Sequence, residues 1–254
     1  MNPNDDDPLR YWSQRSAIRG AAEDEVAKNS RRRLSRALVG AFERTSQSLL
    51  TTGHIFGSNR IDGTSPFGNG DDGLVALGHL SSTASSLILG TVELLDQHNC
   101  YAASALNRQL VEVEYLGWAF AEDHDEAASW LRSTRQERLE RWQPRHLRDR
   151  SRGKFRGLDY AEHCEIGGHP SPQGIRVLTS GRKAETIELI LTEACFHGVS
   201  TWEYLVEAVS AWCADQSLRE SMVPPSIADT VTAAKQTWDT HDHLASTWMA
   251  IRDG

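Results

Sequence analysis

The chain has 254 residues, of which 39% are hydrophobic and 24% charged, so it is long and apolar enough to form a sizeable globular core. Its net charge of −8 argues against a protein that binds polyanions over its whole surface. No apolar run has the length of a membrane span, the first residues lack the pattern of a secretory signal, and the four cysteines are scattered. We therefore expect a cytoplasmic protein with reduced thiols, no membrane association and no cofactor.

The first third of the chain divides by composition. Residues 1–7 are polar and acidic, which is typical of a disordered tail. Over 8–52 the apolar residues recur at helical spacing and predict one long helix or two shorter ones. Residues 53–73 contain six glycines and a proline and predict a long loop, either a plain connector or a lid. We expect 74–254 to be a single helical bundle domain.

Within that domain, helical periodicity alternates with proline and glycine breaks. Helices are predicted over 74–97, 100–121, 124–142, 183–216 and 227–252. The helix over 100–121 is apolar on several sides, which is typical of a central position. Gly198 is a candidate break, Ser226 a candidate N-cap, and 175–179 the one candidate strand. The pattern predicts an all-α protein, a helical bundle with additional N- and C-terminal helices.

Two charged residues stand on the predicted central helix. Arg108 and Glu112 are one turn apart, on the face opposite the main apolar stripe. Arginine before glutamate is the weaker order for a helix-stabilising ion pair, and a desolvated pair is poor evidence for stability. The pair is therefore either structural or part of a site.

His169 is the histidine with the most restricted backbone. Pro170 follows it and disfavours the α conformation, and two glycines precede it. An imidazole with a reference pKa of about 6.5 is suited to proton transfer near neutral pH. The alternative is a histidine that only caps a neighbouring helix.

These two segments together carry a resemblance to a known family. A helix with Arg-x-x-x-Glu, followed by a tyrosine-led segment ending in His-Pro, resembles a group of bacterial helical proteins near the HEPN-like superfamily, over about 74–178. The resemblance implies a HEPN-like bundle that often dimerises and, in active relatives, metal-independent RNA cleavage. By motif it implies catalytic roles for His169 as general base, Arg108 as charge stabiliser, Glu112 as the residue holding Arg108, and Tyr160 as the residue orienting the loop. The nuclease motif Arg-x4–6-His is matched only by Arg141–His146 and Arg156–His163, as often as chance predicts.

A basic segment is the second indication of function. Residues 132–156 contain ten Lys and Arg against three acids. Five arginines recur at steps of three and four and predict one positive helix face for nucleic-acid phosphates: Arg138, Arg141, Arg145, Arg148 and Arg152. The alternative is a solvated face that pairs with acidic surface of the same chain or of a partner.

Three functional hypotheses follow. The first is a protein that binds or cleaves RNA or a nucleotide through an Arg-Glu-His site. The second is a non-enzymatic interaction or regulatory module of a defence or toxin–antitoxin system, in which the same residues are structural. The third is a hydrolase with metal on Glu112, His163, Glu165 and His169, but their spacing matches no metal motif, so we expect no metal. The expected partners are RNA or a nucleotide, and a second copy or a partner protein.

Overall fold

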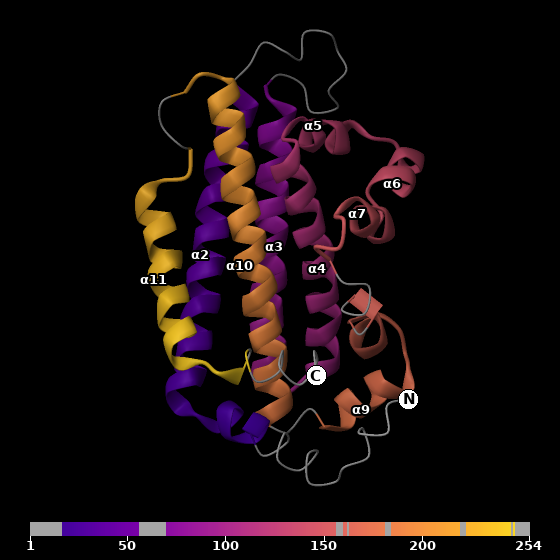
Figure 1. Ribbon diagram of the computed structural model, residues 1–254, viewed down its shortest axis with the longest axis vertical. Coiled ribbons are helices and arrows are strands. Elements are labelled where there is room, and N and C mark those ends of the chain that lie inside the picture. Colours follow the sequence, from indigo (N-terminus) through magenta and orange to yellow (C-terminus); the bar gives the residue numbers. More distant parts are fainter. Residues whose placement is uncertain are drawn as a thin grey trace.

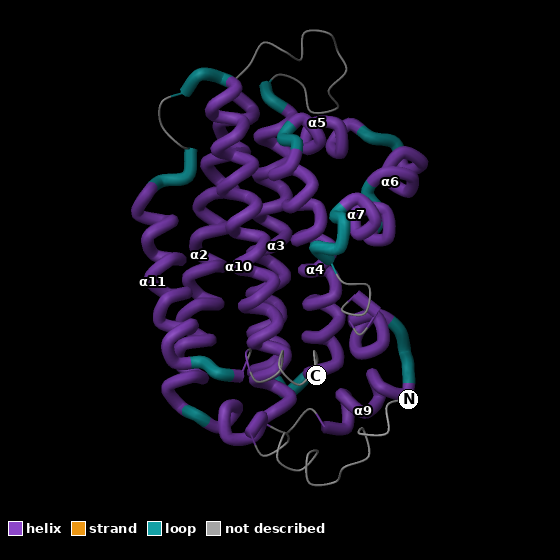
Figure 2. Tube along the Cα trace, in the orientation of Figure 1, coloured by secondary structure: helices purple, strands orange, loops and turns teal. Residues whose placement is uncertain are grey.

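Four long helices form a bundle in the computed structural model (Figure 1). They are α2 (Glu25–Ile55), α3 (Asp72–Asp96), α4 (Cys100–Glu122) and α10 (Ala184–Asp215), and α11 (Pro225–His241) packs along α2. The structure describes residues 17–55, 70–155, 160, 161, 163–180, 184–218, 222–244 and 246. The regular elements of these residues are helical, which confirms the predicted all-α bundle (Figure 2).

Shorter helices lie along α4. An arm of three helices extends beside it: α5 (Asp125–Arg132), α6 (Arg135–Arg141) and α7 (Pro144–Arg150). Towards the other end of α4 pack a π-helical turn, η1 (Cys164–Gly168), and α9 (Pro172–Ser180). Residues far apart in the sequence therefore meet on the surface of α4.

The helices α4 and α10 run parallel and are joined by polar contacts in their interface. Asn107 Nδ2 donates to the carbonyl oxygen of Ile190 at 2.8 Å, and Glu114 Oε2 lies 2.6 Å from His197 Nδ1. From the first contact to the second, the position in the chain advances by seven residues on each helix, which is about two helical turns. Since each contact lies in the buried core, together they fix the register of the two helices.

The beginnings of α2 and α10 and the end of α11 meet at a buried ionic network, which we call the Arg31 network. Arg31, which has no exposed surface, donates from Nε and Nη2 to the two carboxylate oxygens of Asp242 at 2.6 and 2.8 Å. It also donates from Nη1 to Glu188 at 2.6 Å. Burial disfavours the charged guanidinium, but the two carboxylates outweigh it and raise the pKa of Arg31 above its usual value.

The helix α3 is long and apolar enough, by composition, to span a membrane. Its most apolar 18-residue window has a mean hydropathy of 1.3, and 61% of that window is buried inside the bundle. Core helices of globular proteins have this same composition.

Two predicted elements are wrong in detail. The single helix expected over 124–142 is two helices, because Thr134 caps a new one: its hydroxyl accepts from Glu137 N, and the Glu137 carboxylate accepts from Thr134 N. The one candidate strand, 175–179, is part of α9, which begins after Ser171, whose hydroxyl accepts from Gly174 N at 3.0 Å. In both cases a capping residue outweighed the local periodicity.

Other boundaries differ by position. Gly198 does not break α10; a side chain there would meet Ile88 and Leu38, so the glycine allows close packing. The helix α11 starts at Pro225 and ends at His241, so the single helix expected over 227–252 is interrupted at Asp242, while 247–252 lie outside the described residues. Of the loop expected over 53–73, residues 53–55 belong to α2 and 72–73 to α3, while 56–69 lie outside the described residues, as does the tail 1–7.

Candidate functional site

Three of the four residues predicted to be catalytic meet on the outer face of α4. Glu112 Oε1 accepts hydrogen bonds from Arg108 Nη2 and from the Tyr160 hydroxyl, both at 2.8 Å. The Arg108 and Glu112 side chains are 26% and 33% exposed, so the group is accessible at its edge. We call Arg108, Glu112 and Tyr160 the α4 cluster.

The chain segment that brings Tyr160 to α4 depends on close backbone packing. A Cβ atom on Gly167 would lie 2.4 Å from the carbonyl carbon of Ser104, which excludes any other residue without a shift of the backbone. The turn η1 therefore lies directly on α4. Cys164, at its first position, lies near Arg108 and contributes to raising the pKa of that guanidinium.

His169 is not part of this cluster. It follows η1 in extended conformation, at φ −139° and ψ 152°, as a residue before proline should. Its side chain is exposed, and within the described residues its ring has no polar contact with Arg108 or Glu112. The convergence expected of His169 with the arginine–glutamate pair is thus not seen in this structure.

A different histidine pair lies behind the α4 cluster. His197 of α10 contacts Glu114 of α4 through Nδ1 at 2.6 Å and His163 through Nε2 at 3.2 Å. All three residues are buried. An ionised carboxylate only accepts, so His197 donates to Glu114, and a neutral His197 then accepts from His163. We call Glu114, His197 and His163 the relay, because its hydrogen bonds connect a carboxylate to two imidazoles in series.

The sequence analysis missed the relay, although one signal for it exists. Glu114 and His197 stand among apolar residues of two core helices, where a charged or titratable side chain needs a partner. Which partner each one finds depends on the packing of α4 against α10, which periodicity alone does not reveal.

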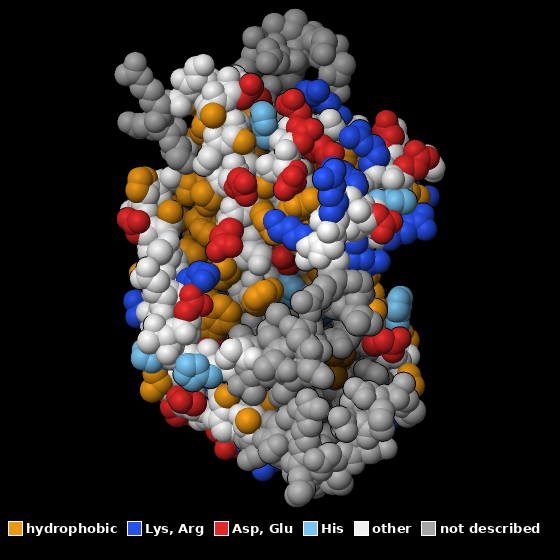
Figure 3. Space-filling view, in the orientation of Figure 1, with side chains coloured by type: hydrophobic (Ala, Val, Ile, Leu, Met, Phe, Trp, Pro, Cys, Tyr) orange, Lys and Arg blue, Asp and Glu red, His pale blue; other side chains and the backbone are white. Residues whose placement is uncertain are grey.

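The five predicted phosphate-binding arginines do not form one continuous helix face. Pro144 starts α7 after Trp142 has ended α6, and Arg152 adopts a left-handed conformation with φ 53° beyond α7. The arginines are distributed over the arm, where Figure 3 shows blue side chains gathered with acidic ones beside them.

The arm arginines divide into two groups by their contacts. Arg132 pairs with Asp72 at 2.6 Å, and Arg150 and Arg141 pair with Glu126 at 2.6 and 3.9 Å. In the described part of the chain the others have no carboxylate within 4.0 Å: Arg135, Arg138, Arg145, Arg148 and Arg152. The first group fastens the arm to the bundle, and the second group forms no ion pair with a described carboxylate.

One contact joins the arm to the α4 cluster. The guanidinium carbon of Arg148 lies 5.0 Å from the centre of the Tyr160 ring, in a cation–π arrangement. Because the Tyr160 hydroxyl is bonded to Glu112, arginines of the arm and of α4 border one continuous surface.

The α4 cluster also shifts two pKa values. Burial and the hydrogen bond to the negative Glu112 raise the pKa of the Tyr160 hydroxyl far above its usual value. Burial disfavours the charge of Arg108, but Glu112 and Cys164 outweigh that effect and raise its pKa. At neutral pH Tyr160 is therefore a neutral phenol and Arg108 a charged guanidinium.

We expect Tyr160→Phe to destabilise the protein by about 1 kcal/mol at pH 7, because a partly exposed hydrogen bond to a carboxylate is lost. The phenol titrates near pH 10 in the unfolded chain and higher in the folded one, so its contribution is complete below about pH 10 and is lost as the pH rises further. Urea unfolding of both proteins between neutral and alkaline pH measures this. A difference that stays constant beyond pH 10 would contradict the assigned contact.

Neither a metal site nor a comparison with known proteins assigns a function to this chain. Within the described residues, no group of three or more His, Cys, Asp and Glu side chains has the arrangement of a metal site. Comparisons with protein-family models, curated proteins and solved structures find no match to this chain. The function must therefore be inferred from the geometry of the site itself.

Proposed function

We propose that the protein binds RNA through its phosphates, on the surface formed by the arm and the α4 cluster. The observation that carries this proposal is the contact of Arg148 with Tyr160, which makes the unpaired arm arginines and Arg108 parts of one surface. Guanidinium groups suit phosphate because their fork of donors matches two phosphate oxygens.

The charges of the arm favour a surface that binds RNA over an arginine face that is only solvated. A protein with 35 acidic residues has carboxylates available, and three arm arginines are paired with them. The predicted residues Arg138, Arg145, Arg148 and Arg152 have no such partner in the described part of the chain. Like charges that share a surface repel one another, and a polyanion relieves that repulsion.

Salt-dependent binding of a single-stranded RNA oligonucleotide tests the proposal. With four phosphate contacts, we expect the logarithm of the binding constant to fall with that of the salt concentration with a slope of about −3. The double variant Arg145→Gln, Arg152→Gln should bind about tenfold more weakly, with a shallower slope. Fluorescence anisotropy measures both quantities.

A matched control removes two charges elsewhere. Lys28 and Lys235 pair with Glu25 and Asp239 on α2 and α11, across the bundle from the arm (Figure 1). The double variant Lys28→Gln, Lys235→Gln should bind RNA like the wild type. RNA affinity that is absent at low salt, or that is equal in the wild type and the arm variant, would refute the proposal and favour a non-enzymatic interaction module.

Cleavage of the bound RNA is a second candidate function, which the relay favours. A general base takes the proton of a 2′-hydroxyl, whose oxygen attacks phosphorus to form a 2′,3′-cyclic phosphate. The bond from phosphorus to the 5′-oxygen breaks, and that oxygen takes a proton from water as it leaves. His163 is oriented through His197 by a carboxylate, and it directly precedes Cys164, which contributes to raising the pKa of Arg108. His163 is buried, so it reaches a substrate only if 160–168 moves.

RNA hydrolysis in the presence of a chelator separates the two histidines. We expect Arg108→Ala and His163→Ala to lose cleavage and His169→Ala to retain it, with melting curves to show that each variant is folded. Loss in His169→Ala alone would restore the assignment made from sequence. A wild type that binds RNA without cleaving it would remove this candidate and leave the binding function.

The same function accords with the resemblance to HEPN-like proteins. We propose that the bundle is HEPN-like and, by the same relationship, that it forms a homodimer in the cytoplasm. Analytical ultracentrifugation measures the assembly, and a sedimentation mass of one chain at micromolar concentration would contradict the dimer.

A further inference from the structure

A groove between α2 and α11 concentrates positive charge away from the arm. It has a volume of about 580 Å³, within the range of small-ligand sites. Three arginines of α2 line it, Arg33, Arg36 and Arg44, against one acidic residue, Asp229 of α11. Since eleven residues are close to three helical turns, Arg33 and Arg44 stand on the same face of α2.

These arginines differ from their immediate neighbours in the chain. Arg31 is engaged by Asp242 and Glu188, and Arg32 pairs with Asp96 at 2.6 Å. By contrast, Arg33, Arg36 and Arg44 have no carboxylate within 4.0 Å among the residues that the structure describes. The arginines that line the groove are thus the ones on this part of α2 that form no ion pair with a described carboxylate.

A glycine lets one of them lie in the groove. Gly40 stands on the groove-lining face of α2, and a Cβ atom there would come within 3.3 Å of Arg44 Nη1. The guanidinium therefore folds back over the helix at the position that a side chain would crowd. Glycine inside a helix is unfavourable relative to alanine, so its presence calls for such a reason.

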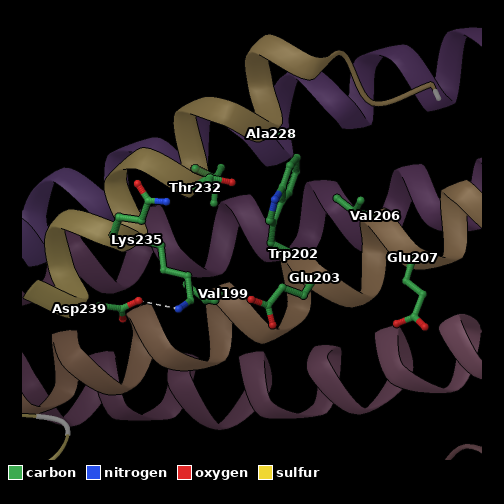
Figure 4. A pocket seen from close by; sticks show the side chains of 11 residues that line it. Val199, Trp202, Glu203, Val206, Glu207, Ala228, Thr232, Lys235 and Asp239 are labelled. Carbon is green, nitrogen blue, oxygen red and sulfur yellow. Dashed lines mark hydrogen bonds and ion pairs between the residues drawn. The ribbon is translucent and has the colours of Figure 1, made fainter. Parts of the chain in front are cut away.

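The groove on the other side of α11 has the opposite character. Between α10 and α11, Val199, Trp202 and Val206 line a hollow whose charged residues include Glu203 and Glu207 (Figure 4). Its one lysine, Lys235, is bonded to Asp239 at 2.7 Å. Positive charge is therefore a specific property of the α2–α11 groove and not of the surface around α11.

We propose that the α2–α11 groove binds an oligophosphate, an anion with two or three linked phosphates. Arg33 and Arg36 are one helical turn apart, so a single phosphate can contact both guanidinium groups. An anion that also contacts Arg44 must be longer. The other lining residues are small, with alanines at 37, 233 and 234, and among the residues that the structure describes none with an aromatic ring lines the groove for a base to stack on. Recognition is therefore of the phosphates alone.

Calorimetric titration with inorganic tripolyphosphate at physiological salt tests this site. We expect a dissociation constant below about 0.1 mM and a similar value for ATP, because the base is not contacted. The double variant Arg36→Gln, Arg44→Gln should weaken binding by about tenfold or more. Arg32→Gln removes a charge from the same helix outside the groove and should change binding less than about twofold.

The variant Gly40→Ala separates a ligand site from a structural feature. Alanine favours the helix, so the melting temperature should rise by about 2 °C, while the displaced Arg44 weakens tripolyphosphate binding. Absence of tripolyphosphate binding at millimolar concentration, an equal loss in Arg32→Gln, or unchanged binding in Gly40→Ala would overturn the proposal.

The site is independent of the proposed RNA surface, and the experiments keep the two apart. Arg36→Gln, Arg44→Gln should bind RNA like the wild type, and Arg145→Gln, Arg152→Gln should bind tripolyphosphate like the wild type. If the groove variant loses RNA binding and the wild type does not bind tripolyphosphate, the groove belongs to a nucleic-acid surface and the oligophosphate site is refuted.

Discussion

Replacing Arg31 with methionine should destabilise the protein by about 3–5 kcal/mol. Arg31 has no exposed surface, and it neutralises both Asp242 and Glu188, whose side chains are at most 7% exposed. Its removal leaves two buried carboxylates without a cation, at the point where α2, α10 and the end of α11 meet. The melting temperature should fall by about 10 °C, and urea unfolding gives the free energy directly.

Two further variants show whether buried charge is the cause. Arg32→Met removes a neighbouring arginine whose partner Asp96 is 59% exposed, and it should cost less than about 1 kcal/mol. The triple variant Arg31→Met, Glu188→Gln, Asp242→Asn removes the unpaired charges together and should recover much of the loss. A triple variant as unstable as Arg31→Met would mean that packing, and not charge, accounts for the effect.

His197→Ala should be the second large loss of stability, again about 3–5 kcal/mol. The substitution leaves the buried carboxylate of Glu114 without its donor, removes the contact with His163 and creates a cavity between α4 and α10. His197→Asn, whose amide nitrogen stands near the position of Nδ1, should recover part of the loss. Chemical denaturation of the three proteins measures these differences.

The matched control is the histidine that the sequence favoured. His169 is exposed, and its contacts through the backbone persist in any residue, so His169→Ala should change the free energy of unfolding by less than about 0.5 kcal/mol. Equal losses of unfolding free energy in His197→Ala and His169→Ala would contradict the structural role given to His197 as the donor to the buried Glu114.

The difference between these two histidines shows what local sequence reveals about a site. Pro170 restricts the backbone of His169, and that restriction is seen in the structure. The same restriction does not determine the path of this segment over the surface of α4. That path depends on the close packing of Gly167 against Ser104. The resemblance named Arg108, Glu112 and Tyr160, which do meet: the first two are one helical turn apart, and Tyr160, which precedes η1, donates directly to Glu112.

Periodicity, glycine and proline positions and composition determined the helical class of this protein and the main boundaries of α3, α4 and α10, because burial of an apolar stripe along a helix is a local property. The same patterns identified the arginine-rich arm and its interruption at Pro144, but not the further division that Thr134 imposes. The partners of Arg31, Glu114 and His197 were decided only by tertiary structure. Each of these charged or titratable groups is buried with a residue at least 80 positions away in the chain, and only the packing of helices brings such groups together.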